Sequence, residues 1–224
     1  MLKAVIFDFD GTIIDTESPW YYALRDAYTR YGAELTLEQY SKCVGTSLDA
    51  FDPYEFLITE FKVPIDKEAF RQQIREEHGK LMAREQMREG VAELLRRAKA
   101  AGLGIGLATS SERAWIDKHM QTLGIADYFD AICTADDVVR VKPDPALYVQ
   151  ALKGLGVEPH EAVAVEDSPN GARAAAATGI PTIVVPNPLT KFMTFDDSEL
   201  YRFADSLADV DFDKLLAGEG IGLA

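Results

Sequence analysis

Two hydrophobic patterns divide the chain. Short uninterrupted apolar runs, each followed by polar residues, occupy the first ten positions and most of the chain after Gly90, whereas residues 16–85 carry apolar side chains at helical spacing. Uninterrupted runs of this length are typical of strands buried in a parallel sheet, and a spacing of three to four residues is typical of amphipathic helices. The sequence therefore predicts an α/β core formed by residues 1–15 and 86–224, with a helical insertion at 16–85.

The expected core strands alternate with expected helices. Strands are predicted at residues 3–7, 103–109, 131–133, 162–165 and 181–185, and helices lie between them, among them 145–155 and 169–177. Because right-handed crossovers join neighbouring parallel strands, this alternation predicts a doubly wound parallel sheet. The acidic tail after Asn187 is expected to dock on the core through scattered apolar side chains, with fraying from residue 218.

The helical segment offers two candidate helix starts and one loop of interest. Thr36 and Asp66 precede helical patterns and are expected to be N-caps. Residues 44–49 form a small polar turn that could close over a ligand, although a plain connection between helices is the simpler reading. The two crossings between core and insertion, near residues 15–17 and 84–90, are candidate hinges.

Charge and cysteine content exclude several classes of function. A formal net charge of −14 disfavours nucleic acid as a partner, and a phosphorylated substrate requires local cations to offset that charge. Cys43 and Cys133 lack the paired spacing of a disulfide framework or a zinc site. The sequence shows neither an apolar run of membrane-spanning length nor a signal peptide, so we expect a cytoplasmic protein without membrane contact, monomeric or dimeric.

Two acids follow the first expected strand. Asp8 and Asp10 are separated by Phe9 and followed by Gly11. Strand side chains alternate with period two, so both carboxylates are expected on the same side, where they repel each other unless a divalent cation or a shared proton relieves the repulsion. The alternative is an ordinary strand end followed by an Asp-Gly turn.

Polar groups also follow three later strands. They are Thr109-Ser110, Lys142-Pro143 and Glu166-Asp167. Taken singly, these read as a helix N-cap, a solvated charge and a turn. Because the carboxyl ends of parallel strands share one edge of the sheet, the groups are expected to gather there. Together they supply the acids, hydroxyls and cation that a site for Mg²⁺ and phosphate requires.

In this order, the four segments resemble the four motifs of the haloacid dehalogenase-like hydrolase superfamily. The resemblance spans residues 3–186 and implies a Rossmann-like core. The helical insertion resembles the cap of the β-phosphoglucomutase and phosphoglycolate phosphatase branch. The motifs are specific for the superfamily and say little about the substrate.

The resemblance implies a role for each motif residue. Asp8 would attack phosphorus and form an aspartyl phosphate, and Asp10 would act as general acid and then as general base. Thr109 or Ser110 would bind phosphate oxygens, and Lys142 would offset the charge of the transferred phosphoryl group.

The same resemblance implies Mg²⁺ as cofactor. Its ligands would be the Asp8 carboxylate, the Asp10 backbone carbonyl, Asp167, and Glu166 either directly or through water. Backbone amides of Phe9 and Gly11 could complete a cradle for phosphate.

Departures from the family pattern guide the choice of reaction. Asp10 and Thr12 argue for a phosphatase and against a dehalogenase. The mutase branch has an Arg and a His in its cap where this chain has Leu48 and Trp20. We therefore expect hydrolysis of a small phosphate monoester, of the sugar phosphate, nucleotide or phosphoglycolate type. A phosphomutase of the β-phosphoglucomutase type and a binding protein on a decayed hydrolase fold are the alternatives. Contacts with the leaving group are assigned to Trp20, Thr46 and Ser47, with packing as the simpler reading of each.

Overall fold

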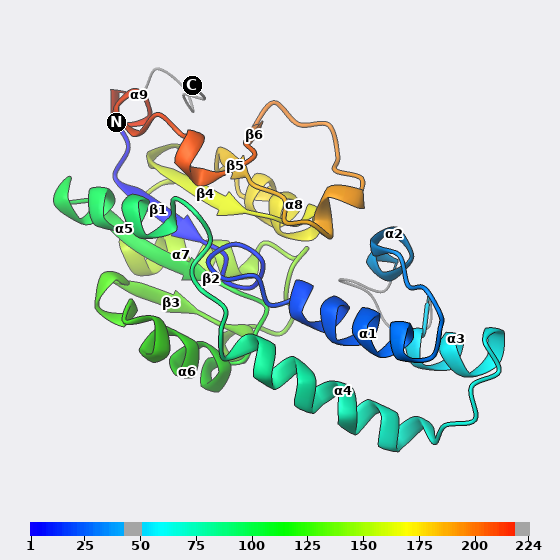
Figure 1. Ribbon diagram of the computed structural model, residues 1–224. Helices are drawn as coiled ribbons and strands as arrows, with labels where there is room; N and C mark the ends of the chain where they lie inside the picture. The colour runs from blue at the N-terminus through cyan, green and yellow to red at the C-terminus, as the bar shows by residue number, and fades with distance from the viewer. Residues whose placement is uncertain (43–50, 218–224) are drawn as a thin grey trace. The chain divides into compact units, whose positions relative to one another are not determined.

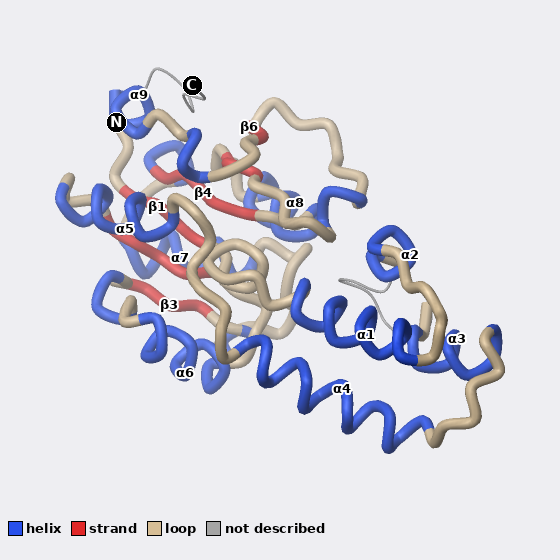
Figure 2. Tube along the Cα trace, viewed as in Figure 1, coloured by secondary structure: helices blue, strands red, loops and turns tan. Residues whose placement is uncertain are grey.

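The computed structural model describes residues 1–42 and 51–217. The chain divides into two compact units. The core unit comprises Met1–Ile14, Gln86–Asn187 and Thr194–Ala224, and the helical unit comprises Asp15–Glu85 and Pro188–Met193. Every strand of the described residues belongs to the core unit, as the red segments of Figure 2 show.

The core unit is built on a parallel sheet of six strands. They are β1 (Ala4–Phe7), β2 (Gly104–Ala108), β3 (Ala131–Cys133), β4 (Ala162–Glu166), β5 (Thr182–Val184) and β6 (Tyr201–Phe203). Their order in the sheet is β3-β2-β1-β4-β5-β6, so β1 lies between β2 and β4. From β1, the strands follow in chain order toward both edges of the sheet, β2 and β3 on one side and β4 to β6 on the other. This arrangement confirms the predicted doubly wound sheet. Strand β6 was not expected, because the sequence indicated only a docked tail there.

Helices cover both faces of this sheet. They are α5 (Val91–Ala100), α6 (Arg113–Leu123), α7 (Ala146–Leu155), α8 (Pro169–Ala177) and α9 (Phe212–Ala217). Helices α7 and α8 pack with Ala4, Ile6 and Ala164 in one apolar cluster, which places both helices on the same face. Figure 1 shows α5 in front of the strands and α7 behind them. With both faces covered, β1 is wholly apolar and β4 is apolar up to Glu166, as the sequence pattern indicated.

The helical unit contains its own apolar core. Its helices are α1 (Ser18–Arg30), α2 (Leu37–Ser41), α3 (Pro53–Glu60) and α4 (Lys67–Met82). Leu24, Tyr28 and Ile74 belong to the buried cluster of this unit. The Thr36 side chain accepts a hydrogen bond from the Gln39 amide and the Asp66 side chain accepts one from the Ala69 amide, so both predicted N-caps are confirmed. None of the described helices combines the length and the apolar character that crossing a membrane would need.

Candidate active site

Asp8 and Lys142 form a buried ion pair at the carboxyl edge of the sheet. Asp8 directly follows β1, and its amide donates to the Val165 carbonyl at 3.0 Å, which fixes the backbone against β4. Lys142 lies in the loop after β3, at a cis peptide bond to Pro143. Its Nζ is 2.5 Å from Asp8 Oδ1, and the two side chains are only 6% and 9% exposed. The structure thus brings the first and third predicted motifs together.

Glu166 holds Lys142 from the opposite side. It is the last residue of β4, and its side chain is fully buried. Glu166 Oε1 accepts hydrogen bonds from Lys142 Nζ at 2.7 Å and from the Tyr148 hydroxyl of α7 at 2.6 Å. Gly171 in α8 lies so close that an added Cβ would overlap the carboxylate. Glu166 is therefore enclosed by its neighbours, and it orients the lysine that contacts Asp8.

Asp167 is the third buried carboxylate. Its Oδ1 accepts from the Thr12 hydroxyl at 3.2 Å, and its Oδ2 accepts from the Asn187 side-chain amide at 2.8 Å. Gly11 adopts a φ of +86° beside it, and a Cβ at that position would overlap Oδ2. Only glycine combines this backbone conformation with so close an approach. The Gly11-Thr12 turn thus places Asp167 next to Asp8.

Burial and mutual repulsion perturb these acids. Burial raises the pKa of Asp8 to about 7, against the attraction of Lys142 and with the charge of Glu166 adding to the rise. Burial also raises the pKa of Asp167 well above its usual range, and the charges of Asp8 and Glu166 act in the same direction. Burial would lower the pKa of Lys142, but Asp8 and Glu166 outweigh it and raise that pKa, so the lysine stays charged.

This cluster fits a hard divalent cation. Asp8, Glu166 and Asp167 each offer an oxygen, and these atoms lie within 4.8 Å of one another. When ionised, the three carboxylates outnumber the two nearby cations, Lys142 and Arg88, whose charges both act on Asp167. Carboxylate and carbonyl oxygens are the ligands that Mg²⁺ prefers, so both the charge and the donor set suit this ion.

The Asp10 carboxylate is held apart from the three-acid cluster. Its Oδ2 accepts from the Ser111 hydroxyl at 2.6 Å, and its Oδ1 accepts from the Trp115 indole N–H at 2.9 Å. His119 packs on Trp115 with ring centroids 3.9 Å apart. Because β1 ends at Phe7, strand alternation does not fix the direction of the Asp10 side chain, although the charge of Asp10 adds to the rise in the pKa of Asp8.

Sequence reasoning missed several residues that contact the acids. Ser111 lies two residues before α6 and Trp115 lies in its first turn, and both donate to Asp10. The sequence signals that could have indicated these two donors were a serine next to the Thr109-Ser110 motif and an aromatic residue four positions later. Tyr148 and Asn187 gave no such signal, because one belongs to an ordinary helix face and the other to a loop after β5.

The remaining predicted residues take varied positions. Thr109 is buried, and its hydroxyl accepts from the Ser111 amide at 3.1 Å, whereas Ser110 is exposed. Phe9 is buried and its carbonyl accepts from the Thr12 amide at 3.2 Å. In the helical unit, Trp20 stacks on His78 with centroids 3.8 Å apart. Thr46 and Ser47 lie outside the described residues.

Comparison with known proteins agrees with the motifs. The family model described as "Haloacid dehalogenase-like hydrolase" matches residues 5–185, which confirms the resemblance drawn from the sequence. "Putative phosphatase YhcW" of Bacillus subtilis (strain 168) is 42% identical over 96% of this chain and 97% of its own. "Phosphorylated carbohydrates phosphatase" of Thermotoga maritima is 31% identical over 81% of this chain and 84% of its own. The solved structure of beta-phosphoglucomutase from Clostridium difficile is similar with a TM-score of 0.65 and 25% identity, covering 97% of this chain and 96% of that one.

Proposed function

The chain belongs to the haloacid dehalogenase-like hydrolase family, and from this membership we propose that it is a Mg²⁺-dependent phosphatase acting on a small phosphate monoester. The observation that carries the proposal is the buried Asp8 carboxylate, paired with Lys142 and surrounded by Glu166 and Asp167. A nucleophile, a cation and a cluster of oxygen ligands at one edge of a sheet are what phosphoryl transfer to a carboxylate needs.

The fit of the acid cluster supports Mg²⁺ as the cofactor. Asp8, Asp167 and the Asp10 backbone carbonyl would hold it, with Glu166 binding directly or through water. When bound, Mg²⁺ supplies positive charge that neutralises phosphate oxygens and the acids that would otherwise repel an anion.

The residues of this chain then divide the reaction into two displacements. An oxygen of Asp8 attacks phosphorus and forms the Asp8–phosphorus bond as the bond from phosphorus to the leaving oxygen breaks. Asp10 gives its proton to that leaving oxygen. In the second displacement a water attacks phosphorus and gives a proton to Asp10, while the bond from the Asp8 oxygen to phosphorus breaks, which releases inorganic phosphate and restores the Asp8 carboxylate. Lys142 offsets the charge on the phosphoryl oxygens, and the hydroxyl of Thr109 or Ser110 orients them.

The substrate class follows from the relatives and the insertion. The relative named for phosphorylated carbohydrates supports a sugar phosphate, with a nucleotide or a phosphoglycolate-type substrate as the other candidates. The helical insertion at residues 16–85 would serve as a cap that contacts the leaving group through Trp20, Thr46 and Ser47. The similarity to beta-phosphoglucomutase favours a phosphomutase as second candidate. Leu48 stands where the mutase branch has the Arg for the distal phosphate, and Trp20 stands where that branch has a His. The lack of these groups argues for hydrolysis.

An assay of inorganic phosphate release separates these functions. The substrates are p-nitrophenyl phosphate, sugar phosphates, nucleotides and 2-phosphoglycolate, each with Mg²⁺ and with EDTA. We expect release with Mg²⁺ only, and we expect Asp8→Asn to lower it by about 1,000-fold or more while circular dichroism shows an intact fold. Wild-type rates in Asp8→Asn would remove Asp8 from the nucleophile role. Turnover that needs a bisphosphate activator and leaves phosphate on the product would identify a mutase.

A further inference from the structure

Arg88 lies in the segment that enters the core unit before α5. Its amide donates to the Ile13 carbonyl at 2.8 Å, and the neighbouring Met87 forms an antiparallel bridge with Ile14. This stretch therefore runs alongside the turn that follows Asp8 and Asp10. Arg88 belongs to none of the four family motifs.

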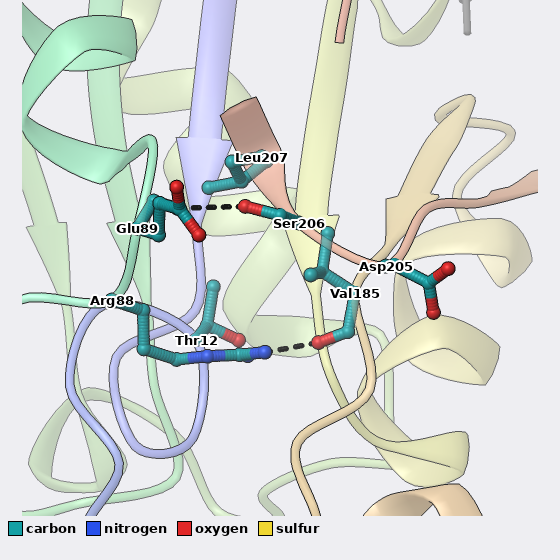
Figure 3. Close-up of a pocket in the computed structure, with 7 residues that line it drawn as sticks. All are labelled: Thr12, Arg88, Glu89, Val185, Asp205, Ser206 and Leu207. Atoms are coloured by element: carbon teal, nitrogen blue, oxygen red, sulfur yellow. Dashed lines mark hydrogen bonds between the residues drawn. The ribbon is translucent and has the colours of Figure 1, made fainter. Parts of the chain in front are cut away.

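The Arg88 guanidinium joins two loops at the carboxyl edge of the sheet. Its Nη1 donates to the Gly11 carbonyl and, at 2.8 Å, to the Val185 carbonyl, and its Nη2 donates to the Pro186 carbonyl at 3.2 Å. Figure 3 shows the side chain extending past Thr12 to Val185. Thr12, Arg88 and Val185 line a cavity of about 200 Å³. The turn after β1 and the segment after β5 are thus tied to a single side chain.

Each loop that Arg88 binds also supplies a donor to Asp167. Thr12, which directly follows Gly11, donates to Asp167 Oδ1, and Asn187, which directly follows Pro186, donates to Asp167 Oδ2. The guanidinium therefore anchors the residue before each donor. Because a backbone carbonyl and the Cα of the next residue belong to one planar peptide unit, fixing the carbonyl fixes the Cα from which the donor side chain extends.

We propose that Arg88 is a positioning residue that orients the Asp167 carboxylate for a divalent cation by fixing the two loops that bind its oxygens. The inference rests on the proposed metal-dependent function. A planar guanidinium can reach three separated carbonyls at once, whereas a lysine in its place offers a point charge without that fork. Residues that orient a metal ligand through hydrogen bonds set metal affinity without touching the ion.

The test measures metal binding directly. Mn²⁺, used as a probe for the Mg²⁺ site, is titrated into metal-free protein at pH 8, with free Mn²⁺ followed by electron paramagnetic resonance. We expect Arg88→Met to weaken Mn²⁺ binding by about 10- to 100-fold. Arg88→Lys keeps the positive charge but loses the planar set of N–H donors, so we expect Mn²⁺ affinity to fall by about threefold or more. The matched control is Arg96→Met on α5, where Arg96 is 62% exposed and pairs with Glu93, and its affinity should equal that of wild type.

Every outcome of this titration decides the proposal. If Arg88→Met is folded by circular dichroism and binds Mn²⁺ as tightly as wild type, the positioning role is wrong. If Arg88→Met does not fold, Arg88→Lys decides, and wild-type affinity in that variant overturns the proposal. A wild-type protein that binds no Mn²⁺ overturns the proposed function together with this inference, whereas intact wild-type binding with unaffected variants overturns the role of Arg88 alone. In the kinetics, raised Mg²⁺ should recover turnover in Arg88→Met, because the defect lies in metal affinity.

Discussion

Replacing Lys142 with methionine should cause a loss of stability that depends strongly on pH. The substitution keeps an unbranched side chain of similar length but removes the charge that lies against Asp8 and Glu166. The lysine side chain is only 6% exposed, so water does not replace it readily. In the absence of metal, the variant leaves Asp8, Glu166 and Asp167 together with no lysine among them.

The size of the stability loss depends on whether a carboxyl next to position 142 stays ionised without a partner or takes up a proton. Removing one partner of a buried ion pair costs about 3–5 kcal/mol when the other partner stays charged. Protonating Asp8 avoids this cost, and relative to the wild-type protein it costs about 1.4 kcal/mol for each pH unit above the wild-type pKa of about 7. At pH 5 Asp8 is protonated in both proteins, so its charge should add almost nothing to the loss. At pH 8 protonation is still cheaper than an unpaired buried charge, and the electrostatic loss should be about 1.4 kcal/mol.

The sign follows from the direction of the pKa shift. The folded-state pKa of Asp8 is already raised to about 7, and loss of Lys142 raises it further. A carboxyl with a raised pKa costs no stability below its unfolded-state pKa, and its cost grows as pH rises toward the folded-state pKa. Because Asp8 is protonated in both proteins well below pH 7, the destabilisation of Lys142→Met relative to wild type must increase as pH rises from about 6 to 8.

Urea unfolding followed by far-ultraviolet circular dichroism measures this loss, at pH 5 and pH 8 in EDTA. The control is Lys3→Met, which removes an exposed ion pair with Glu161 and should change stability by about 0.5 kcal/mol or less at both pH values. An equal loss for Lys142→Met at both pH values would show that lost packing, not unpaired charge, dominates. A smaller loss at pH 8 than at pH 5 would refute the electrostatic reasoning outright.

Two further predictions concern the metal and Asp10. Because protons compete with Mg²⁺ for Asp8, whose pKa is about 7, and for Asp167, whose pKa is also raised, Mg²⁺ affinity measured by calorimetry should fall by at least about tenfold per pH unit below pH 7, and an affinity independent of pH would contradict this. Trp115→Phe removes the indole donor to Asp10 and leaves the Ser111 hydroxyl, so kcat should fall about tenfold with the melting temperature little changed. An unchanged kcat would show that Asp10 does not depend on Trp115.

Most of the sheet and its helices could be predicted because burial on both faces leaves a clear signal. The predicted strand at 131–133 and helix at 169–177 coincide with β3 and α8, the latter marked by a Ser168 N-cap and by Pro169 at its first position. Strand β6 could not be predicted, because it spans three residues of which only Tyr201 is buried. Pairing with β5 makes it a strand, and that pairing is a tertiary contact.

The sequence could predict which residues of the candidate site lie at the ends of strands. Each motif follows a strand, and parallel topology brings Asp8, Lys142, Glu166 and Asp167 to one edge. The chemical roles of these residues remain predictions. The donors Trp115, Tyr148 and Arg88 could not be predicted from the sequence, because they lie outside the motifs. The direction of their side chains depends on how helices and loops pack against the sheet.

The position of β1 in the sheet has a consequence for biosynthesis. Of the six strands of the sheet it comes first in the chain, yet Ala4 lies beside Gly104 on one side and Ala162 on the other, and Asp8 pairs with a lysine 134 residues later. A ribosome that has released β1 but not yet β2 therefore exposes a strand lacking both neighbours and a carboxylate lacking its counterion. The ability to bind a metal should therefore appear late in translation, once β4 has left the ribosome and paired with β1.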